Sequence, residues 1–129
     1  VLGYGRIGKT LTGMLRGLGS EVIVAARRTE ARKEAGENSV SIEEMGNVIG
    51  NVDWVFNTVP HVVMDEKVLK RMNGQTPIME LASVPYGVDM EKAAQMGIQV
   101  QIEGGLPGRY CPEDAARAWL DFIERSVGK

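Results

Sequence analysis

The sequence has few of the residues that build disulfides or zinc sites, and it has no long apolar run. It contains one Cys and one His in 129 residues, which excludes an internal disulfide and leaves too few soft ligands for a structural zinc site. No apolar run approaches the length that spans a membrane, and no signal peptide is visible. We therefore expect a protein of a reducing, cytoplasmic compartment that binds neither a metal nor a membrane.

The sequence also lacks an excess of charge and an initiator Met. Its formal net charge is -2, and the charged residues are spread along the chain, so no basic face for nucleic acid is predicted. The length fits one domain, which we assign to residues 1–129. Because the chain opens inside what should be its first strand, we expect it to be a fragment of a longer protein.

A glycine-rich motif stands at the start of the chain. Two apolar residues, typical of the end of a strand, lead into segment 3–8, which has the pattern GxGxxG. In this pattern Gly3 allows a tight turn, Gly5 lets the backbone approach a pyrophosphate, and Gly8 lets the next helix pack closely on the sheet. The start of that helix offers N–H groups and a partial positive charge to phosphates.

The residues after the motif complete a βαβ unit. The expected helix has an apolar face made of Ile7, Leu11, Met14, Leu15 and Leu18. Gly19 ends this helix, and a second strand follows over residues 21–26. This context favours a dinucleotide-binding turn over a glycine turn without a ligand.

Strands and helices continue to alternate along the rest of the chain. The later strands are expected at 39–40, 52–59, 77–82 and 99–102, and helices at the segment ending at 36, at 41–49, 65–72 and 89–96, and from Pro112 onward. A capping box of Ser41 and Glu44 opens the second of these helices. We predict an α/β fold with a doubly wound parallel sheet, a Rossmann NAD(P)-binding domain with strand order 3-2-1-4-5-6.

The end of the second strand predicts which cofactor is preferred. NAD-binding versions of this fold place a carboxylate there for the ribose hydroxyls, whereas this chain has Ala26 and Arg27, followed by Arg28. Guanidinium groups pair with a 2'-phosphate, which a carboxylate would repel. The pattern favours NADP over NAD. The alternative is that these arginines, with Arg32, form only a solvated start to the next helix.

Loops after three strands are expected to meet at the carboxyl edge of the sheet, where such folds bind their ligands. They are residues 57–61, 82–88 and 103–110. The residues that we expect to contact the cofactor are Gly3, Tyr4, Gly5, Arg6, Ile7, Gly8, Ala26, Arg27, Arg28, Thr58, Val59, Pro60, Ala82 and Ser83.

Other residues near this edge carry chemistry whose role the sequence leaves open. His61 is either a proton shuttle or a surface loop residue. Cys111 precedes an expected helix and is either an activated thiol or a small, partly buried cap residue. Glu80 lies within an expected strand, so its carboxylate must be paired or lie near the cofactor. No catalytic residue is assigned.

Several segments together resemble one family. Residues 3–8, 25–27, 57–60, 81–89 and 105–108 occur in the same order and at similar spacing in the nucleotide-binding domain of the A subunit of dipicolinate synthase. The resemblance spans nearly the whole chain. Within the segment 81–89, Val84 replaces a common Arg or Lys and Tyr86 replaces a common Gly, which affects expected substrate contacts.

This resemblance implies a biological setting and a reaction. Members of the family carry an N-terminal substrate-side domain, which would join ahead of Val1, and act with a flavoprotein-like B subunit. They oxidise dihydrodipicolinate to dipicolinate in the mother cell of spore-forming bacteria. The resemblance therefore implies an NAD(P)-dependent oxidoreductase subunit whose fragment alone binds cofactor without turnover, and we also expect a homo-oligomer.

Two other functions stay open at this point. The cofactor domain of a 2-hydroxyacid dehydrogenase has the same layout, but its catalytic Arg would fall at Ser83, and its catalytic His, in the loop after the sixth strand, has no counterpart here. A nucleotide-sensing module that binds cofactor without turnover is the third possibility, because no acid/base pair is evident in the sequence.

Overall fold

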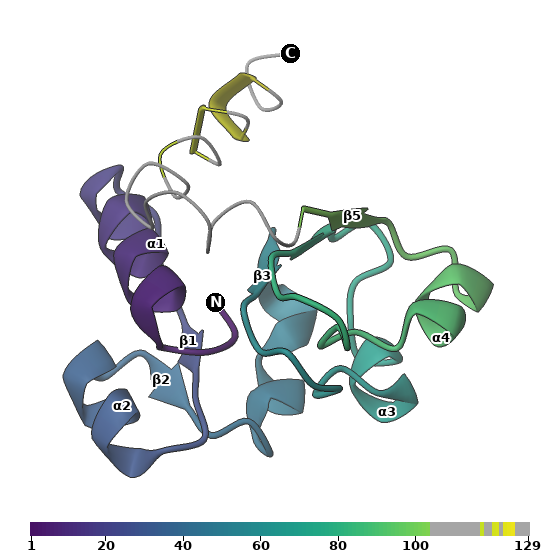
Figure 1. Ribbon diagram of the computed structural model, residues 1–129, viewed down its shortest axis with the longest axis horizontal. Helices are drawn as coiled ribbons and strands as arrows, with labels where there is room; N and C mark the ends of the chain where they lie inside the picture. Colours follow the sequence, from purple (N-terminus) through teal and green to yellow (C-terminus); the bar gives the residue numbers. More distant parts are fainter. Residues whose placement is uncertain (104–116, 118–119, 122, 126–129) are drawn as a thin grey trace.

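A computed structural model of the chain describes residues 1–103, 117, 120–121 and 123–125. Its helices and strands alternate along the chain (Figure 1). In order, they are α1 (Arg6–Gly17), β1 (Val24–Ala25), α2 (Thr29–Ala35), β2 (Ser39–Val40), the 3-10 helices η1 (Met45–Asn47) and η2 (Ile49–Asn51), β3 (Val55–Asn57), α3 (Glu66–Leu69), β4 (Ile78–Glu80), α4 (Met90–Gln95) and β5 (Val100–Ile102).

All the strand pairings among the described residues are parallel. β1 pairs with β2, while β3, β4 and β5 form a ladder in that order. Leu2 joins the two groups through single parallel bridges to Ala25 on one side and Asn57 on the other. These pairings agree with the predicted order 3-2-1-4-5-6 but do not fully confirm it, because the first strand is represented by one bridge residue and not by a ladder.

The sheet is covered on both faces, as a doubly wound fold requires. Successive strand residues point to opposite faces, so Val24 and Phe56 pack in one core cluster with α1 and α2. Ala25 and Val55 belong to the other cluster, which includes residues of η1, η2, α3 and α4. The predicted α/β class is therefore confirmed.

The segment 41–49 differs from its predicted helix. The capping box forms, since the Glu44 N–H donates to Ser41 Oγ at 3.2 Å and the Ser41 N–H donates to Glu44 Oε2 at 3.4 Å. The chain then makes two short 3-10 helices instead of an α-helix. Gly46 and Gly50 pack against Arg71, with no room for a Cβ at Gly50, and two glycines in so short a segment weaken its helix propensity.

Other predicted elements are confirmed with shorter bounds. Strands predicted over six or eight residues contain two or three ladder residues. The pattern predicts Leu18 on the buried face of α1, but the helix ends at Gly17 and Leu18 is 56% exposed. Gly36 and Gly97 end α2 and α4 with positive φ, as expected for C-terminal glycines.

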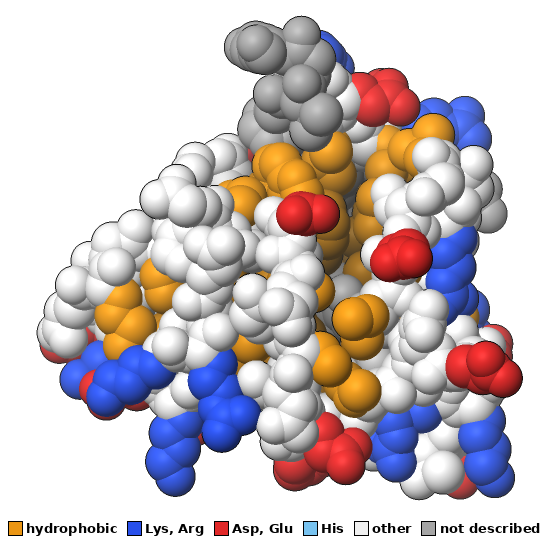
Figure 2. Space-filling view, turned by 180° about the vertical axis from the view of Figure 1, so that it is seen from behind, with side chains coloured by type: hydrophobic (Ala, Val, Ile, Leu, Met, Phe, Trp, Pro, Cys, Tyr) orange, Lys and Arg blue, Asp and Glu red, His pale blue; other side chains and the backbone are white. Residues whose placement is uncertain are grey.

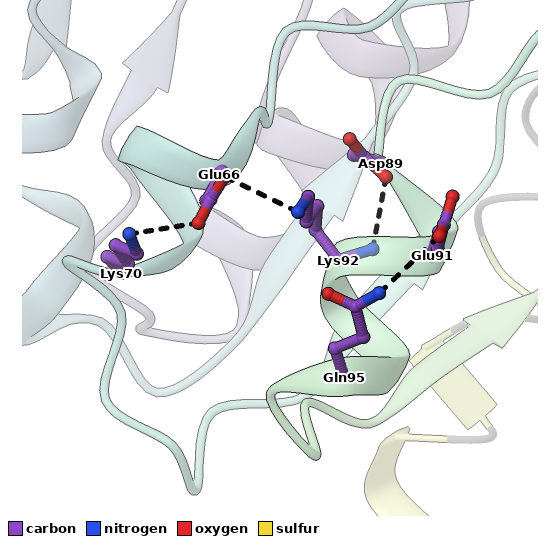
Figure 3. A network of polar contacts seen from close by, with 6 residues as sticks. All are labelled: Glu66, Lys70, Asp89, Glu91, Lys92 and Gln95. Carbon is purple, nitrogen blue, oxygen red and sulfur yellow. Dashed lines mark hydrogen bonds and ion pairs between the residues drawn. The ribbon is translucent and has the colours of Figure 1, made fainter.

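Polar contacts join α3 to α4 on the surface (Figure 3). Glu66 pairs with Lys70 at 2.9 Å, just past the end of its own helix, and with Lys92 of α4 at 3.6 Å. These two lysines hold the pKa of the Glu66 carboxyl below its usual value, mainly through the hydrogen bond from Lys70. Asp65 and Asp89 cap the two helices by accepting from backbone N–H groups. Because the ion pairs are exposed, they orient the helices more than they stabilise them.

The rear face of the molecule is mixed in character. Figure 2 shows a band of hydrophobic side chains there, with Lys, Arg, Asp and Glu gathered below and beside it.

Among the described helices, none combines the length and hydropathy needed to cross a membrane.

Some predictions fall outside the described residues. These are the loop 104–110 with the family-like segment 105–108, Cys111, and the start and most of the apolar face of the last helix. Of that helix, Leu120 is buried and Ile123 packs against the cluster that contains α1.

The close packing of α1 on the first strand predicts opposite effects for two glycine substitutions in the same helix. A Cβ at position 8 would overlap the carbonyl oxygen of Gly3, whereas one at position 13 meets nothing within 4 Å. We expect Gly8→Ala to lower the free energy of unfolding by about 1–3 kcal/mol. Gly13→Ala should raise it by up to about 1 kcal/mol, because alanine favours helix.

Urea denaturation followed by circular dichroism measures both changes. Equal effects of the two substitutions would contradict the close contact between α1 and Gly3.

Candidate nucleotide-binding site

The glycine turn has the geometry that its sequence predicts. Gly3 has a φ of 93°, a conformation that favours glycine. A Cβ there would also overlap Thr58 Oγ1, and one at Gly8 would overlap the carbonyl of Gly3. Gly5 differs from both, because a Cβ there would point into open space. Two glycines thus serve the packing of the chain on itself, while the third leaves the backbone open to a ligand.

The start of α1 is available to an anion. Gly5 is the N-cap residue and has no side chain with which to cap the helix, and the first turn of α1 carries no acidic residue. Helix N-termini leave N–H groups without intrahelical partners and carry a partial positive charge. In Figure 1 this end of α1 faces the region of β1, β2 and α2. The turn therefore presents uncompensated donors beside the sheet edge.

A cavity of about 170 Å³ lies at this edge. Its walls come from the glycine turn, the end of β1, the start of α2, the residue after Ser41 and the loop after β3. The lining residues are Gly3, Tyr4, Gly5, Ala26, Arg27, Arg28, Ala31, Ile42, Val59, His61 and Val63. The structure thus brings the predicted fingerprint, the predicted arginines and Val59 together around one hollow.

The cavity rim is cationic. Arg27 and Arg28 are both exposed, and no ion pair among the described residues involves either of them. Arg32 differs, because its guanidinium donates to the carbonyls of Ala26 and Arg27 at 2.9 and 2.7 Å. Arg32 therefore holds the backbone that carries the two exposed arginines. No Asp or Glu lines the cavity within the part of the chain that the structure describes.

Several predicted contact residues lie outside the cavity wall. Arg6, Ile7 and Gly8 form the first turn of α1, behind the open face of Gly5. Thr58 supports the turn, since its Oγ1 donates to the carbonyl of Leu2 at 2.7 Å. Pro60 and Ser83 are exposed and Ala82 is buried, and none of these three lines the cavity.

Sequence reasoning missed four lining residues as cofactor contacts: Ala31, Ile42, His61 and Val63. The three apolar ones give no local signal, because they look like ordinary core positions. For His61, the sequence indicates only a proton shuttle or a surface residue. Its exposed ring lies at the rim, with Nε2 2.8 Å from Arg27 Nη2.

A buried carboxylate orders the loops farther along the crevice. Glu80 has no exposed surface. Its Oε1 accepts from Asn57 Nδ2 at 2.7 Å and from the Ala82 N–H at 3.0 Å, and its Oε2 accepts from the Gly87 N–H at 3.1 Å. Glu80 is therefore paired, which was one of the two roles that its sequence position left open.

Asn57 extends this network to the cavity. Its amide group donates to the Val59 carbonyl at 2.9 Å and accepts from the Val59 N–H at 3.1 Å. A Cβ at Gly87 would overlap the Asn57 amide. One buried carboxylate thus connects the loop after β4 with the loop after β3, which lines the cavity.

Burial governs the protonation of Glu80. Loss of hydration raises the pKa of its carboxyl above the usual value, and the hydrogen bonds from Asn57, Ala82, Gly87 and Val88 offset part of that rise. All these partners are donors, so they are arranged for a carboxylate.

The chain matches a known family of domains. Residues 1–82 match the family model described as "D-isomer specific 2-hydroxyacid dehydrogenase, NAD binding domain". The chain belongs to this family of NAD-binding domains. The matched residues include the glycine turn, the end of β1 and the crevice loop after β3.

The chain is also similar to the A subunit of dipicolinate synthase. It is 35% identical over 132 aligned residues to that protein from Bacillus subtilis (strain 168), an alignment that covers 100% of this chain and 44% of the relative. The resemblance indicated by the sequence motifs is therefore confirmed. The chain spans less than half the length of this curated relative.

Solved structures agree with this relationship. The A subunit of dipicolinate synthase from Bacillus halodurans has a TM-score of 0.77 at 31% identity, with 99% of this chain and 45% of that chain covered. Its counterpart from Bacillus subtilis has a TM-score of 0.77 at 30% identity, covering 98% and 44%. A quinone oxidoreductase from Thermus thermophilus, solved also with NADPH, shares the fold, with a TM-score of 0.60 at 17% identity over 97% and 41%.

The Glu80 network predicts a large effect for an isosteric substitution. In Glu80→Gln, an NH2 group replaces one carboxylate oxygen and must face a donor, either from Asn57 and Ala82 or from Gly87. We expect the free energy of unfolding to fall by about 1–3 kcal/mol. The exposed Glu43→Gln is the matched control and should change it by less than about 0.5 kcal/mol.

The pH dependence of this difference has a defined sign. Because the folded-state pKa of Glu80 is raised, the folded protein holds its proton more tightly than the unfolded chain. The stability that wild type gains from this proton is present below the unfolded pKa and is lost as pH rises through the folded pKa. The gap in unfolding free energy between wild type and Glu80→Gln should therefore narrow as pH rises above about 4.5. Urea titrations at several pH values measure the gap, and a gap that widens would contradict this assignment.

Proposed function

We propose that this domain binds NADP in preference to NAD. The proposal is supported by three features of the cavity and its edge: uncapped amides at the start of α1, two arginines that join no ion pair among the described residues, and the lack of carboxylates among the described lining residues. The amides suit the diphosphate of a dinucleotide. Arg27 and Arg28 suit the additional phosphate on the adenosine ribose. Together they fit the adenosine half of the nucleotide.

The nicotinamide half would lie farther along the carboxyl edge. Val59 lines the cavity and is held by Asn57, which in turn is held by Glu80. The loops carrying Thr58 to Pro60 and Ala82 to Ser83 follow the neighbouring strands β3 and β4. A bound nicotinamide nucleotide supplies a hydride acceptor or donor for two-electron chemistry. In this chain the loops would orient it and the glycine turn would anchor it.

We further propose that the domain serves an oxidoreductase like dipicolinate synthase, whose A subunit it resembles and which oxidises dihydrodipicolinate to dipicolinate during sporulation. Similarity over the whole chain to that subunit from two Bacillus species supports this assignment. The chain covers less than half of each relative, which is consistent with a substrate-side domain in the whole protein. A flavoprotein-like B subunit and a homo-oligomeric assembly, in the mother cell of a spore former, are parts of the same proposal.

A 2-hydroxyacid dehydrogenase is the second candidate because the family model carries that description. Its catalytic Arg is expected at the position of Ser83, which is exposed and outside the cavity. This residue cannot replace a guanidinium in binding a substrate carboxylate. We therefore rank the dipicolinate synthase-like role above it.

Reversing the charge of Arg27 tests the cofactor preference. In Arg27→Asp a carboxylate faces the extra phosphate of NADPH but can accept hydrogen bonds from the ribose hydroxyls of NADH. We expect NADPH affinity to fall by at least roughly tenfold, with NADH affinity kept or increased. Calorimetric titration of both nucleotides measures the change.

The control for this experiment is Arg16→Asp, which makes the same charge change on the exposed side of α1, away from the cavity. It should leave both affinities nearly unchanged. Equal NADPH and NADH affinities in the wild-type chain would refute the phosphate role, and an equal loss of both in Arg27→Asp would indicate disruption of the fold.

The reaction is tested with the full-length subunit and its partner. We expect cofactor-dependent formation of dipicolinate from dihydrodipicolinate, followed by absorbance. Nucleotide binding without product under any pairing of subunits would favour a nucleotide-sensing role instead.

A further inference from the structure

Arg27 and His61 come from distant parts of the chain and meet at the cavity rim. Arg27 follows β1, whereas His61 lies in the loop between β3 and α3. Their side-chain nitrogens, Nη2 and Nε2, are 2.8 Å apart, and both residues line the cavity. The same loop carries Val59, which the buried Asn57 holds in place on both its N–H and its carbonyl. The position of His61 is therefore built on an ordered loop.

The chemistry of this contact defines the state of the imidazole. A guanidinium can only donate, so Nε2 of His61 must accept with its lone pair, and the ring proton lies on Nδ1. A proton on Nε2 would set two N–H donors against each other at this distance, and a second ring proton would also make the imidazole a cation. A phosphate bound against both groups reverses the situation, because it accepts hydrogen bonds from both. His61 then changes from an acceptor to a charged donor.

The described groups around His61 provide no negative charge for a protonated imidazole, so a bound anion has to provide it. The end of β1 contributes Arg27 and Arg28, and the glycine turn contributes Tyr4. The cavity-lining residues of α2 and of the segment after β2 are apolar, and no carboxylate is among the lining residues that the structure describes. None of these described residues can neutralise a protonated imidazole. The extra phosphate of NADP carries the charge that is missing.

We propose that His61 is a specificity-determining residue for the phosphorylated dinucleotide. It donates to the 2'-phosphate together with Arg27 and takes up one proton from solvent on Nε2 as the nucleotide binds. The N–H bond formed on Nε2 is the single covalent change in this step. The inference rests on the proposed preference for NADP and adds a proton-linked contact to it, because a proton on Nε2 turns His61 from an acceptor into a donor.

Replacing His61 by glutamine tests this role. The amide oxygen of His61→Gln can still accept from Arg27, but the side chain cannot gain a proton. We expect wild type to bind NADPH roughly tenfold more tightly than the variant at about pH 6, equivalent to about 1.4 kcal/mol. The difference should shrink at about pH 8, and NADH affinities should match at both pH values.

Proton uptake gives a second readout that a merely structural role would not change. Calorimetry in buffers of different ionisation enthalpy should show more protons taken up per NADPH bound by wild type than by His61→Gln. Comparing the two proteins cancels the titration of the nucleotide phosphate itself. Identical NADPH affinities and identical proton uptake would overturn the role of His61. A thermal denaturation curve checks that the variant is folded.

The outcomes separate this inference from the function on which it rests. A wild-type chain that prefers NADPH while His61→Gln behaves identically overturns the role of His61 alone. A wild-type chain that binds NADPH and NADH equally overturns both the role of Arg27 and that of His61. A chain that binds neither nucleotide overturns the proposed function itself.

Discussion

The contact between α1 and the first strand is the constraint on which the site depends. Gly8 lies so close to the carbonyl of Gly3 that no side chain fits at position 8, and Thr58 leaves no room for one at position 3. This packing fixes the position and direction of the helix. Its uncapped amides consequently lie at the carboxyl edge of the sheet, beside the end of β1, where the two arginines stand. Packing and anion binding are therefore two consequences of one glycine pattern.

A second constraint acts on the other half of the crevice. Burying the carboxylate of Glu80 is unfavourable, and its hydrogen bonds with Asn57 and two backbone N–H groups offset that cost. In return, the loops after β3 and β4 are joined to each other. The cationic half of the cavity is thus open and exposed, while the loops beyond it are held by a buried polar network. This division suits a nucleotide that is anchored by its phosphates and oriented at its reactive end.

The sequence predicted the parts of this arrangement that depend on local pattern. The glycine turn, the α/β order, the end of β1 with its arginines and the capping box of Ser41 and Glu44 follow from residue types at fixed spacing. The family resemblance was likewise readable from short segments. Contacts between distant residues are not predictable from local pattern. The position of Glu80 in a strand indicates that its carboxylate needs a partner, but the sequence does not identify Asn57 as that partner. No local pattern links His61 to Arg27. The 3-10 turns at 45–51 arise from glycines packed on Arg71, a contact absent from local pattern.

The central claim is that the first turn of α1 holds the diphosphate of a nicotinamide nucleotide. Titration of the ¹⁵N-labelled chain with NADPH, followed by the backbone amide signals in NMR spectra, tests it most directly. The account predicts that the largest shifts occur at Gly5, Arg6 and Ile7, because their amides would face the diphosphate. Saturable shifts confined to other parts of the chain, with these three amides unchanged, would contradict it.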